Sequence, residues 1–137
     1  MKKIDKFEVI VLGIIFNPQT KKILLGRREN DPEIPELTWC FPGGRLNFNK
    51  DIDEALKENI LKKTGYKVKN LGSIFSKTYP EKQEQIGIYF LTEAFEGEEK
   101  AGEDLVELKW VSPKEIENYF TTSFHRKLKK FLLELVE

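Results

Sequence analysis

The sequence predicts an α/β fold in which helices cover a mixed β-sheet. Strand-like apolar runs recur from residue 9 to residue 111, one central segment has helical apolar spacing, and the final segment carries a one-sided apolar stripe. A helix in the middle and a helix at the end of a strand-rich chain imply an α/β sandwich. With 137 residues, 39% of them hydrophobic, we expect residues 1–137 to form a single domain.

The first half of the chain contains three predicted strands, at residues 9–16, 23–25 and 38–41. The turn-forming cluster at residues 17–22 separates the first two strands. Residues 30–37 contain two prolines and three acidic residues, which predicts a surface loop before the third strand. Pro42-Gly43-Gly44 is then expected to end that strand.

The predicted central helix spans residues 52–63 and begins directly after a capping residue. Its apolar residues recur at helical spacing and are Ile52, Ala55, Leu56 and Ile60. Asp51 is a suitable N-cap, and Gly65 is a suitable stop signal. The sequence therefore predicts a helix of about three to four turns.

The second half predicts three more strands, at residues 66–76, 86–95 and 106–111. The polar stretch at residues 80–85 and the acidic, glycine-containing stretch at residues 96–104 are expected to be loops. Ser112 is expected to cap a short helix with Pro113 at its first position. Ser123 is expected to cap a terminal helix over residues 124–136.

Composition restricts the possible partners and the expected location. The 23 Lys and Arg residues balance the 23 Asp and Glu residues, so the net charge gives no reason to expect nucleic acid or an anionic membrane as partner. The amino-terminal segment lacks the pattern of a signal peptide, and no apolar run is long enough to span a bilayer. The one cysteine, Cys40, is expected to be reduced and buried. These features together predict a cytoplasmic protein.

The segment Trp39-Cys40-Phe41-Pro42-Gly43-Gly44-Arg45, followed by a helix that ends Lys63-Thr64-Gly65-Tyr66, resembles the signature of the Nudix (MutT-like) hydrolase family. The family's box runs Gly, five residues, Glu, seven residues, Arg-Glu-apolar-any-Glu-Glu-any-Gly-apolar. With Gly44 as the first glycine, Gly65 falls on the closing glycine without a gap. The resemblance extends to residues 24–28 and 107–113, which look like other strands of the family. It implies the Nudix type of α/β/α sandwich, flanked by the box helix and a C-terminal helix.

The resemblance implies a degenerate box. In the family, glutamates three and four residues apart on the box helix hold divalent cations against a diphosphate. In this chain the same positions hold Asn59, Lys62 and Lys63, so we expect no metal site and no cofactor. Lys50 stands at the position of the box's earlier glutamate, and Glu58 stands at the position of its arginine. The ion pair that these positions form in the family is therefore predicted to form here with its charges exchanged. Mg²⁺ or Mn²⁺ would be needed only if the chain is nevertheless a hydrolase.

A narrower resemblance is to the GDP-mannose mannosyl hydrolase branch of the Nudix family. It rests on an Asn17-Pro18 turn, the stretch at residues 24–28 and Pro42-Gly43-Gly44-Arg45. By this resemblance Arg28 and Arg45 match arginines that neutralise the departing nucleoside diphosphate, a role that suits a guanidinium group. The chain departs from the branch in three ways: Lys63 replaces the last box glutamate, Leu12 replaces a first-strand aspartate, and no histidine precedes the last strand.

Other residues are weaker candidates for the site. Lys62 and Lys63 can hold phosphate directly, or can simply favour the C-terminal end of the helix dipole. Gly43 and Gly44 let the backbone approach a ligand. The side chains that could stack on a base or sugar are Phe16, Phe41 and Tyr79. The loop carboxylates that could serve as a general base are Glu84, Glu103 and Asp104. His125, the only histidine, is expected to be a solvated surface residue.

These observations favour a degenerate Nudix domain that binds a nucleotide or a nucleoside-diphosphate derivative, such as a nucleotide sugar, without the usual metal-dependent hydrolysis. The expected site is a cleft bounded by Arg28, Arg45 and the box helix. One alternative is a weak or atypical hydrolase of GDP-mannose-like nucleoside-diphosphate sugars, with Glu84 or Glu103 as the catalytic carboxylate. A second alternative is a ligand-free interaction or dimerisation domain. The sequence leaves open whether the chain is an enzyme, and the family resemblance implies a possible homodimer.

Overall fold

The computed structural model describes residues 6–29 and 38–136. The loop predicted at residues 30–37 lies outside the described residues. In chain order the elements are β1 (Glu8–Asn17), β2 (Lys22–Arg28), β3 (Trp39–Cys40), β4 (Gly43–Arg45), α1 (Ile52–Thr64), β5 (Tyr66–Tyr79), β6 (Lys82–Gly97), β7 (Leu105–Val111), the 3₁₀-helix η1 (Ile116–Tyr119) and α2 (Arg126–Glu134). No helix in this part of the chain has the length and apolar character needed to cross a membrane.

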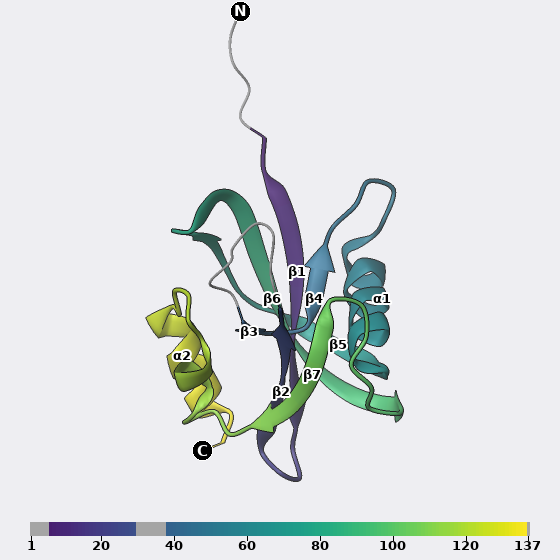
Figure 1. The fold of residues 1–137 in the computed structure, drawn as a ribbon, viewed down its shortest axis with the longest axis vertical. Coiled ribbons are helices and arrows are strands. Elements are labelled where there is room, and N and C mark those ends of the chain that lie inside the picture. Colours follow the sequence, from purple (N-terminus) through teal and green to yellow (C-terminus); the bar gives the residue numbers. More distant parts are fainter. Residues whose placement is uncertain (1–5, 30–37, 137) are drawn as a thin grey trace, which may run out of the picture.

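The described strands form one mixed, seven-stranded sheet. Its main order is β3-β2-β1-β6-β5, with β4 paired to β1 and β7 paired to β2. β1 and β6 run parallel, and the other pairs are antiparallel. Helix α1 lies on one side of the sheet and α2 on the other (Figure 1). This arrangement confirms the predicted α/β/α sandwich.

Two apolar clusters hold the helices to the two faces of the sheet. Ile14 belongs to the cluster that includes the buried residues of α2, and Ile15 belongs to the cluster that includes those of α1. Successive residues of a strand point to opposite faces, so β1 supplies both clusters at once. Burial on both faces explains why the first apolar run of the sequence is nearly continuous and does not alternate.

Helix α1 begins and ends as its sequence predicts. The Asp51 side chain accepts a hydrogen bond from the backbone N–H of Asp53 at 3.1 Å. At the other end Gly65 adopts a left-handed conformation with φ of 83°, and its N–H donates to the carbonyl of Leu61. These two caps satisfy backbone groups that the helix cannot satisfy internally. They also fix the helix relative to the loop that precedes it.

The prediction of a loop at residues 80–85 is wrong. β5 and β6 form one long hairpin, and Tyr79 pairs with Lys82 across a turn at Pro80 and Glu81. The polar residues that follow this turn belong to β6, since Gln85 pairs with Glu8 in the parallel ladder to β1. The backbone ladder thus supports a polar segment that has little strand preference of its own. β6 also extends to Gly97, which shortens the predicted loop at residues 96–104.

The sequence suggested that Gly43 and Gly44 end a strand. In the structure they also belong to a strand of their own. Together with Arg45 they form β4, which pairs antiparallel with β1. A Cβ atom at Gly43 would collide with the Val11 carbonyl oxygen. The glycine is therefore required by the close approach of two backbones, a use that a sequence pattern cannot distinguish from a strand breaker.

Both predicted caps in the C-terminal region are wrong. Ser112 is followed by a turn, and the short helix is a 3₁₀-helix whose N-cap is Glu115. α2 begins at Arg126, and His125 is its N-cap because the Nδ1 atom accepts from the Lys127 N–H at 3.1 Å. His125 is exposed, as predicted, but it also lies with its ring centroid 4.8 Å from that of Phe75.

Candidate functional site

A cavity of about 320 Å³ lies between the sheet and the segment that leads into α2. Five of the residues that the sequence singled out for ligand binding line it, namely Arg28, Gly43, Gly44, Arg45 and Lys63. Lys62 does not line it, and neither do Glu84 and Glu103. The described structure therefore brings together the predicted glycines and arginines with one of the two predicted lysines.

At the end of the cavity next to α1, one carboxylate connects two cations. The Arg28 guanidinium lies 2.8 Å from Oδ2 of Asp104, and the Lys63 ammonium lies 3.2 Å from Oδ1 of the same side chain. The exposed fractions of the Arg28 and Lys63 side chains are 26% and 16%. Partial burial strengthens such charge-assisted contacts relative to those on an open surface. We call Arg28, Lys63 and Asp104 the ionic cluster.

The loop between β6 and β7 fixes the position of Asp104. Backbone N–H groups of Lys100 and Gly102 donate to the carbonyls of Thr64 and Lys63 at 2.9 and 3.1 Å. These bonds satisfy carbonyls at the C-terminal end of α1 that have no partner inside the helix. A Cβ atom at Gly102 would collide with the Lys62 carbonyl, so the loop packs tightly against the helix end.

Arg45 lies at the rim of the cavity, with half of its side chain exposed. Its guanidinium is 3.3 Å from a carboxylate oxygen of Glu8, and the ammonium of Lys82 is 2.9 Å from the other oxygen. The hydrogen bond from Lys82, together with the charges of Lys82 and Arg45, holds the pKa of the Glu8 carboxyl below its ordinary value. Arg45 thus belongs to a second charged group, separate from the ionic cluster.

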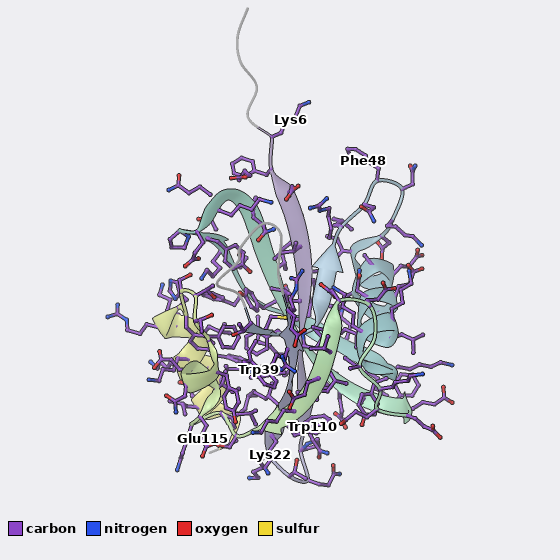
Figure 2. All side chains as sticks on the ribbon, in the orientation of Figure 1. Lys6, Lys22, Trp39, Phe48, Trp110 and Glu115 are labelled. Atoms are coloured by element: carbon purple, nitrogen blue, oxygen red, sulfur yellow. The ribbon has the colours of Figure 1, made fainter. Side chains whose placement is uncertain are left out.

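The predicted ion pair between Lys50 and Glu58 is present. The Lys50 ammonium lies 2.8 Å from Oε1 of Glu58. This hydrogen bond lowers the pKa of the Glu58 carboxyl and raises that of the Lys50 ammonium. The pair bridges the loop after β4 to the middle of α1. The loop's tip extends away from the body of the molecule at Phe48, whose side chain is 99% exposed (Figure 2).

The residues at the family's metal positions do not fit a divalent cation. Asn59 donates a hydrogen bond from its amide nitrogen to the Ala55 carbonyl at 2.8 Å, and its amide packs against Gly44. Lys63 is engaged with Asp104, and Lys62 is exposed. Mg²⁺ requires several oxygen ligands, of which this helix face offers only the Asn59 carbonyl. Within residues 6–29 and 38–136, no cluster of three or more His, Cys, Asp or Glu side chains could hold a metal ion.

The opposite end of the cavity is aromatic. The hydroxyls of Tyr79 and Tyr89 lie 2.8 Å apart in a hydrogen bond. Burial raises the pKa of both phenols, that of Tyr89 to about 12. Phe41 meets the Tyr89 ring edge to face, with centroids 5.8 Å apart, and also contacts Phe120. Phe41 and Tyr79, two of the three predicted stacking candidates, line the cavity, whereas Phe16 packs against the core.

Three polar residues close this aromatic end. Glu81 accepts hydrogen bonds from the backbone N–H and the hydroxyl of Ser123 at 2.9 and 2.8 Å, and the Lys77 ammonium donates to the same hydroxyl at 3.4 Å. Burial lowers the pKa of Lys77. Burial opposes ionisation of Glu81, but the bonds from Ser123 hold its pKa below the ordinary value. Sequence reasoning missed the role of Lys77 and Glu81, and it assigned Ser123 to a helix cap.

Comparison with known proteins identifies the family. The family model for the NUDIX domain matches residues 6–132. The chain is 35% identical over 109 residues to an ADP-ribose pyrophosphatase of Methanocaldococcus jannaschii, a match that covers 74% of this chain and 60% of the relative. It is 27% identical over 118 residues to a putative 8-oxo-dGTP diphosphatase of Bacillus subtilis, covering 86% of this chain and 75% of the relative.

Solved structures share the fold. A NUDIX hydrolase from Nitrosomonas europaea superimposes with a TM-score of 0.78 at 20% identity, covering 96% of this chain and 73% of that one. The MutT protein from Methanosarcina mazei Go1 gives a TM-score of 0.73 at 19% identity, covering 98% and 96%. The signature from Gly44 to Gly65, the sandwich and the family match agree, and the chain belongs to the NUDIX domain family.

Proposed function

We propose that this chain binds a nucleoside-diphosphate derivative in the cavity and does not carry out metal-dependent hydrolysis. The observation that carries the proposal is the ionic cluster. Lys63 occupies the position of a metal-binding glutamate in the family's box, lines the cavity and shares a carboxylate with Arg28. An ammonium group at this position repels a divalent cation and attracts the phosphate that the cation would otherwise neutralise.

The charges of the cavity support an anionic ligand. Among the described residues its lining has four cationic side chains, Arg28, Arg45, Lys63 and Lys77, and two carboxylates, Glu81 and Asp104. The chain as a whole carries equal numbers of positive and negative residues, so the positive excess is local. A concave site lined by one sign of charge concentrates ligands of the opposite sign.

The shape and lining of the cavity support a nucleoside. Its volume of about 320 Å³ lies near the lower limit of typical small-molecule pockets. Phe41 and Tyr89 are buried behind the lining, and the half-buried Tyr79, Phe120 and Phe124 supply its apolar ring surface. A ligand with a planar base at one end and a diphosphate at the other matches this polarity.

The relatives support the same class of ligand. Their names refer to ADP-ribose and 8-oxo-dGTP, both of which join a nucleoside to a chain of phosphates. The presence of Arg28 and Arg45 at one cavity is what the GDP-mannose mannosyl hydrolase resemblance would require, so a nucleotide sugar belongs among the ligands to be tested.

A weak or atypical hydrolase is the second candidate. It is favoured by the two carboxylates that line the cavity, Glu81 and Asp104, because a general base must lie within reach of a bound ligand. Of the three carboxylates considered from the sequence, Asp104 lines the cavity, whereas Glu84 and Glu103 are exposed and lie outside the lining. The candidate would therefore depend on a carboxylate other than these two.

Thermal unfolding with a ligand panel separates the candidates. Wild type and the variants Lys63→Glu and Lys62→Glu are each mixed with ADP-ribose, GDP-mannose or a nucleoside triphosphate in EDTA, and products are measured in parallel with Mg²⁺ or Mn²⁺. We expect stabilisation of wild type and Lys62→Glu by at least one ligand, its loss in Lys63→Glu, and no turnover. Turnover would establish the hydrolase, and the absence of any stabilisation would leave an interaction or dimerisation domain.

We further propose a cytoplasmic location and a homodimer. Cys40 is the one cysteine of the sequence, so the chain cannot form an internal disulfide, which supports a reducing compartment. The dimer is proposed from the family resemblance alone. Light scattering of the purified chain tests it, and a monomer mass would overturn it.

A further inference from the structure

The two oxygens of Asp104 are held by two different cations. Oδ2 contacts Arg28 at 2.8 Å, and Oδ1 contacts Lys63 at 3.2 Å. A phosphate group presents the same pattern, because its anionic oxygens can be shared between separate donors. If the cavity binds a diphosphate as proposed above, the ligand and Asp104 must compete for the same guanidinium and ammonium groups.

The backbone around Asp104 is firmly held, but its carboxylate can leave. The Gly102 N–H donates to the Lys63 carbonyl, and the Leu105 N–H donates to the Gly102 carbonyl at 3.0 Å. Leu105 itself is buried, with 3% of its surface exposed. The Asp104 side chain is 37% exposed, so a rotation about its side-chain bonds carries the carboxylate into water without displacing the loop.

This exchange lowers the affinity of every anionic ligand by the same factor. Binding replaces two ionic contacts of Asp104 with two contacts of the ligand, so only the surplus of the new contacts over the old ones contributes to affinity. A carboxylate ligand merely replaces another carboxylate and gains almost nothing. A diphosphate, with more charge and more acceptor oxygens, retains a surplus.

We propose that Asp104 acts as a built-in competitor for the phosphate-binding groups Arg28 and Lys63 and thereby sets the absolute affinity of the site for anions. It sets an affinity threshold that a diphosphate passes and that simple carboxylates and weakly bound anions do not. The inference rests on the proposed function, and it deepens that function by assigning the ligand class to diphosphates.

The test is calorimetric titration of inorganic pyrophosphate, AMP, acetate and ADP-ribose, in EDTA and at fixed ionic strength. The proteins are wild type, Asp104→Asn, Asp104→Ala and the control Glu107→Gln. Glu107 of β7 forms a comparable pair with Arg27 of β2 at 2.8 Å, but it does not line the cavity. Thermal unfolding of each variant without ligand checks that it folds.

We expect Asp104→Asn and Asp104→Ala to bind pyrophosphate and AMP more tightly by similar factors, on the order of tenfold, and Glu107→Gln to match wild type. Acetate should bind only when Asp104 is replaced. Unchanged or weaker binding of pyrophosphate in both Asp104 variants would overturn the inference. In that case, binding of ADP-ribose by wild type would still uphold the proposed function. If neither wild type nor the variants bind any of the phosphates, the proposed function and the inference both fail.

Discussion

The end of the cavity next to α1 and the aromatic end opposite it are positioned by different parts of the chain. The first end is framed by β4 and α1, which lie within residues 43–65, and it is completed by Arg28 and Asp104. The second end forms only where the β5–β6 hairpin meets the segment before α2, through Glu81 and Ser123. Local signals therefore specify the loop and helix that frame the first end, whereas its ionic cluster and the whole of the second end depend on long-range contacts.

The comparison shows that the backbone geometry of a site and the charges of its side chains can vary separately. Caps and glycines hold the box loop and helix in place, and neither depends on the charges that the helix displays. Lys50 and Glu58 form an ion pair between the loop and α1, and Lys63 takes part in the ionic cluster. The predictions below test whether the two ends are equally well built and whether the frame still accepts its former chemistry.

The largest expected effect comes from the two apolar clusters that hold α1 and α2 to the sheet. Leu56 of α1 and Leu128 of α2 are buried, with 0% and 2% of their surface exposed. Leu56→Ala and Leu128→Ala should each lower the free energy of unfolding by about 2–5 kcal/mol because both leave a cavity in a packed cluster. Urea unfolding measures the change. A loss well below this range for one variant would mean that its helix is not firmly packed on the sheet.

The next prediction tests whether the box loop and α1 can be given a metal site. Asn59→Glu, Lys62→Glu and Lys63→Glu together place three carboxylates on adjacent turns of α1, one of them beside Asp104, so the triple variant should be less stable than wild type without metal. Mg²⁺ or Mn²⁺ at a hundred times its dissociation constant should then add about 2.7 kcal/mol. Thermal unfolding with each metal measures this, with wild type as the control. A folded variant with no metal-dependent gain would show that the box positions are misassigned.

The aromatic end can be tested through its hydroxyl pair. Tyr79→Phe leaves the buried Tyr89 hydroxyl without its partner, which should cost about 1–3 kcal/mol. Replacing both tyrosines by phenylalanine should cost less than the sum of the two single changes, since the double variant leaves no unpaired hydroxyl. A double-mutant cycle in urea measures the coupling. Additive costs would mean that the two hydroxyls do not depend on each other.

The smallest effect concerns the pH dependence of Glu81. Because its folded-state pKa is lowered, its ionised form stabilises the fold above the unfolded pKa of about 4.3, and this contribution is lost as pH falls through the folded pKa. Glu81→Gln should therefore be less stable than wild type at pH 7, by less than about 1 kcal/mol, and the difference should shrink as the pH falls below the unfolded pKa. Glu84→Gln, on the same strand pair but outside the cavity, is the control. A difference independent of pH would contradict a role for the carboxylate charge.

Sequence reasoning succeeded where the signals were local. Asp51, Gly65 and the helical spacing between them located α1, and the spacing of the box predicted the contact between Lys50 and Glu58. It failed where a segment's conformation depends on a distant partner. The polar residues after Pro80 form a strand because β1 pairs with them.

The same limit applies to the candidate site. Arg28, Arg45 and Lys63 were predicted from the family frame, and all three line the cavity. Ser123 carries a typical helix-capping side chain, but Glu81 of the hairpin binds both its backbone and its hydroxyl. No spacing in the sequence relates these two residues, since the fold alone brings them together. Asp104 was one acidic residue among several in its loop, and only the structure separates it from Glu103.

The most direct test of the central claim, that cations of the protein replace the metal at the box helix, is the metal dependence of ligand binding. ADP-ribose is titrated into wild type once in EDTA and once in Mg²⁺, with dissociation constants measured by calorimetry and products measured in the recovered solution. We predict the same dissociation constant in both buffers and intact ADP-ribose at the end of each titration. Binding that requires Mg²⁺, or the appearance of AMP in the Mg²⁺ titration, would contradict the account.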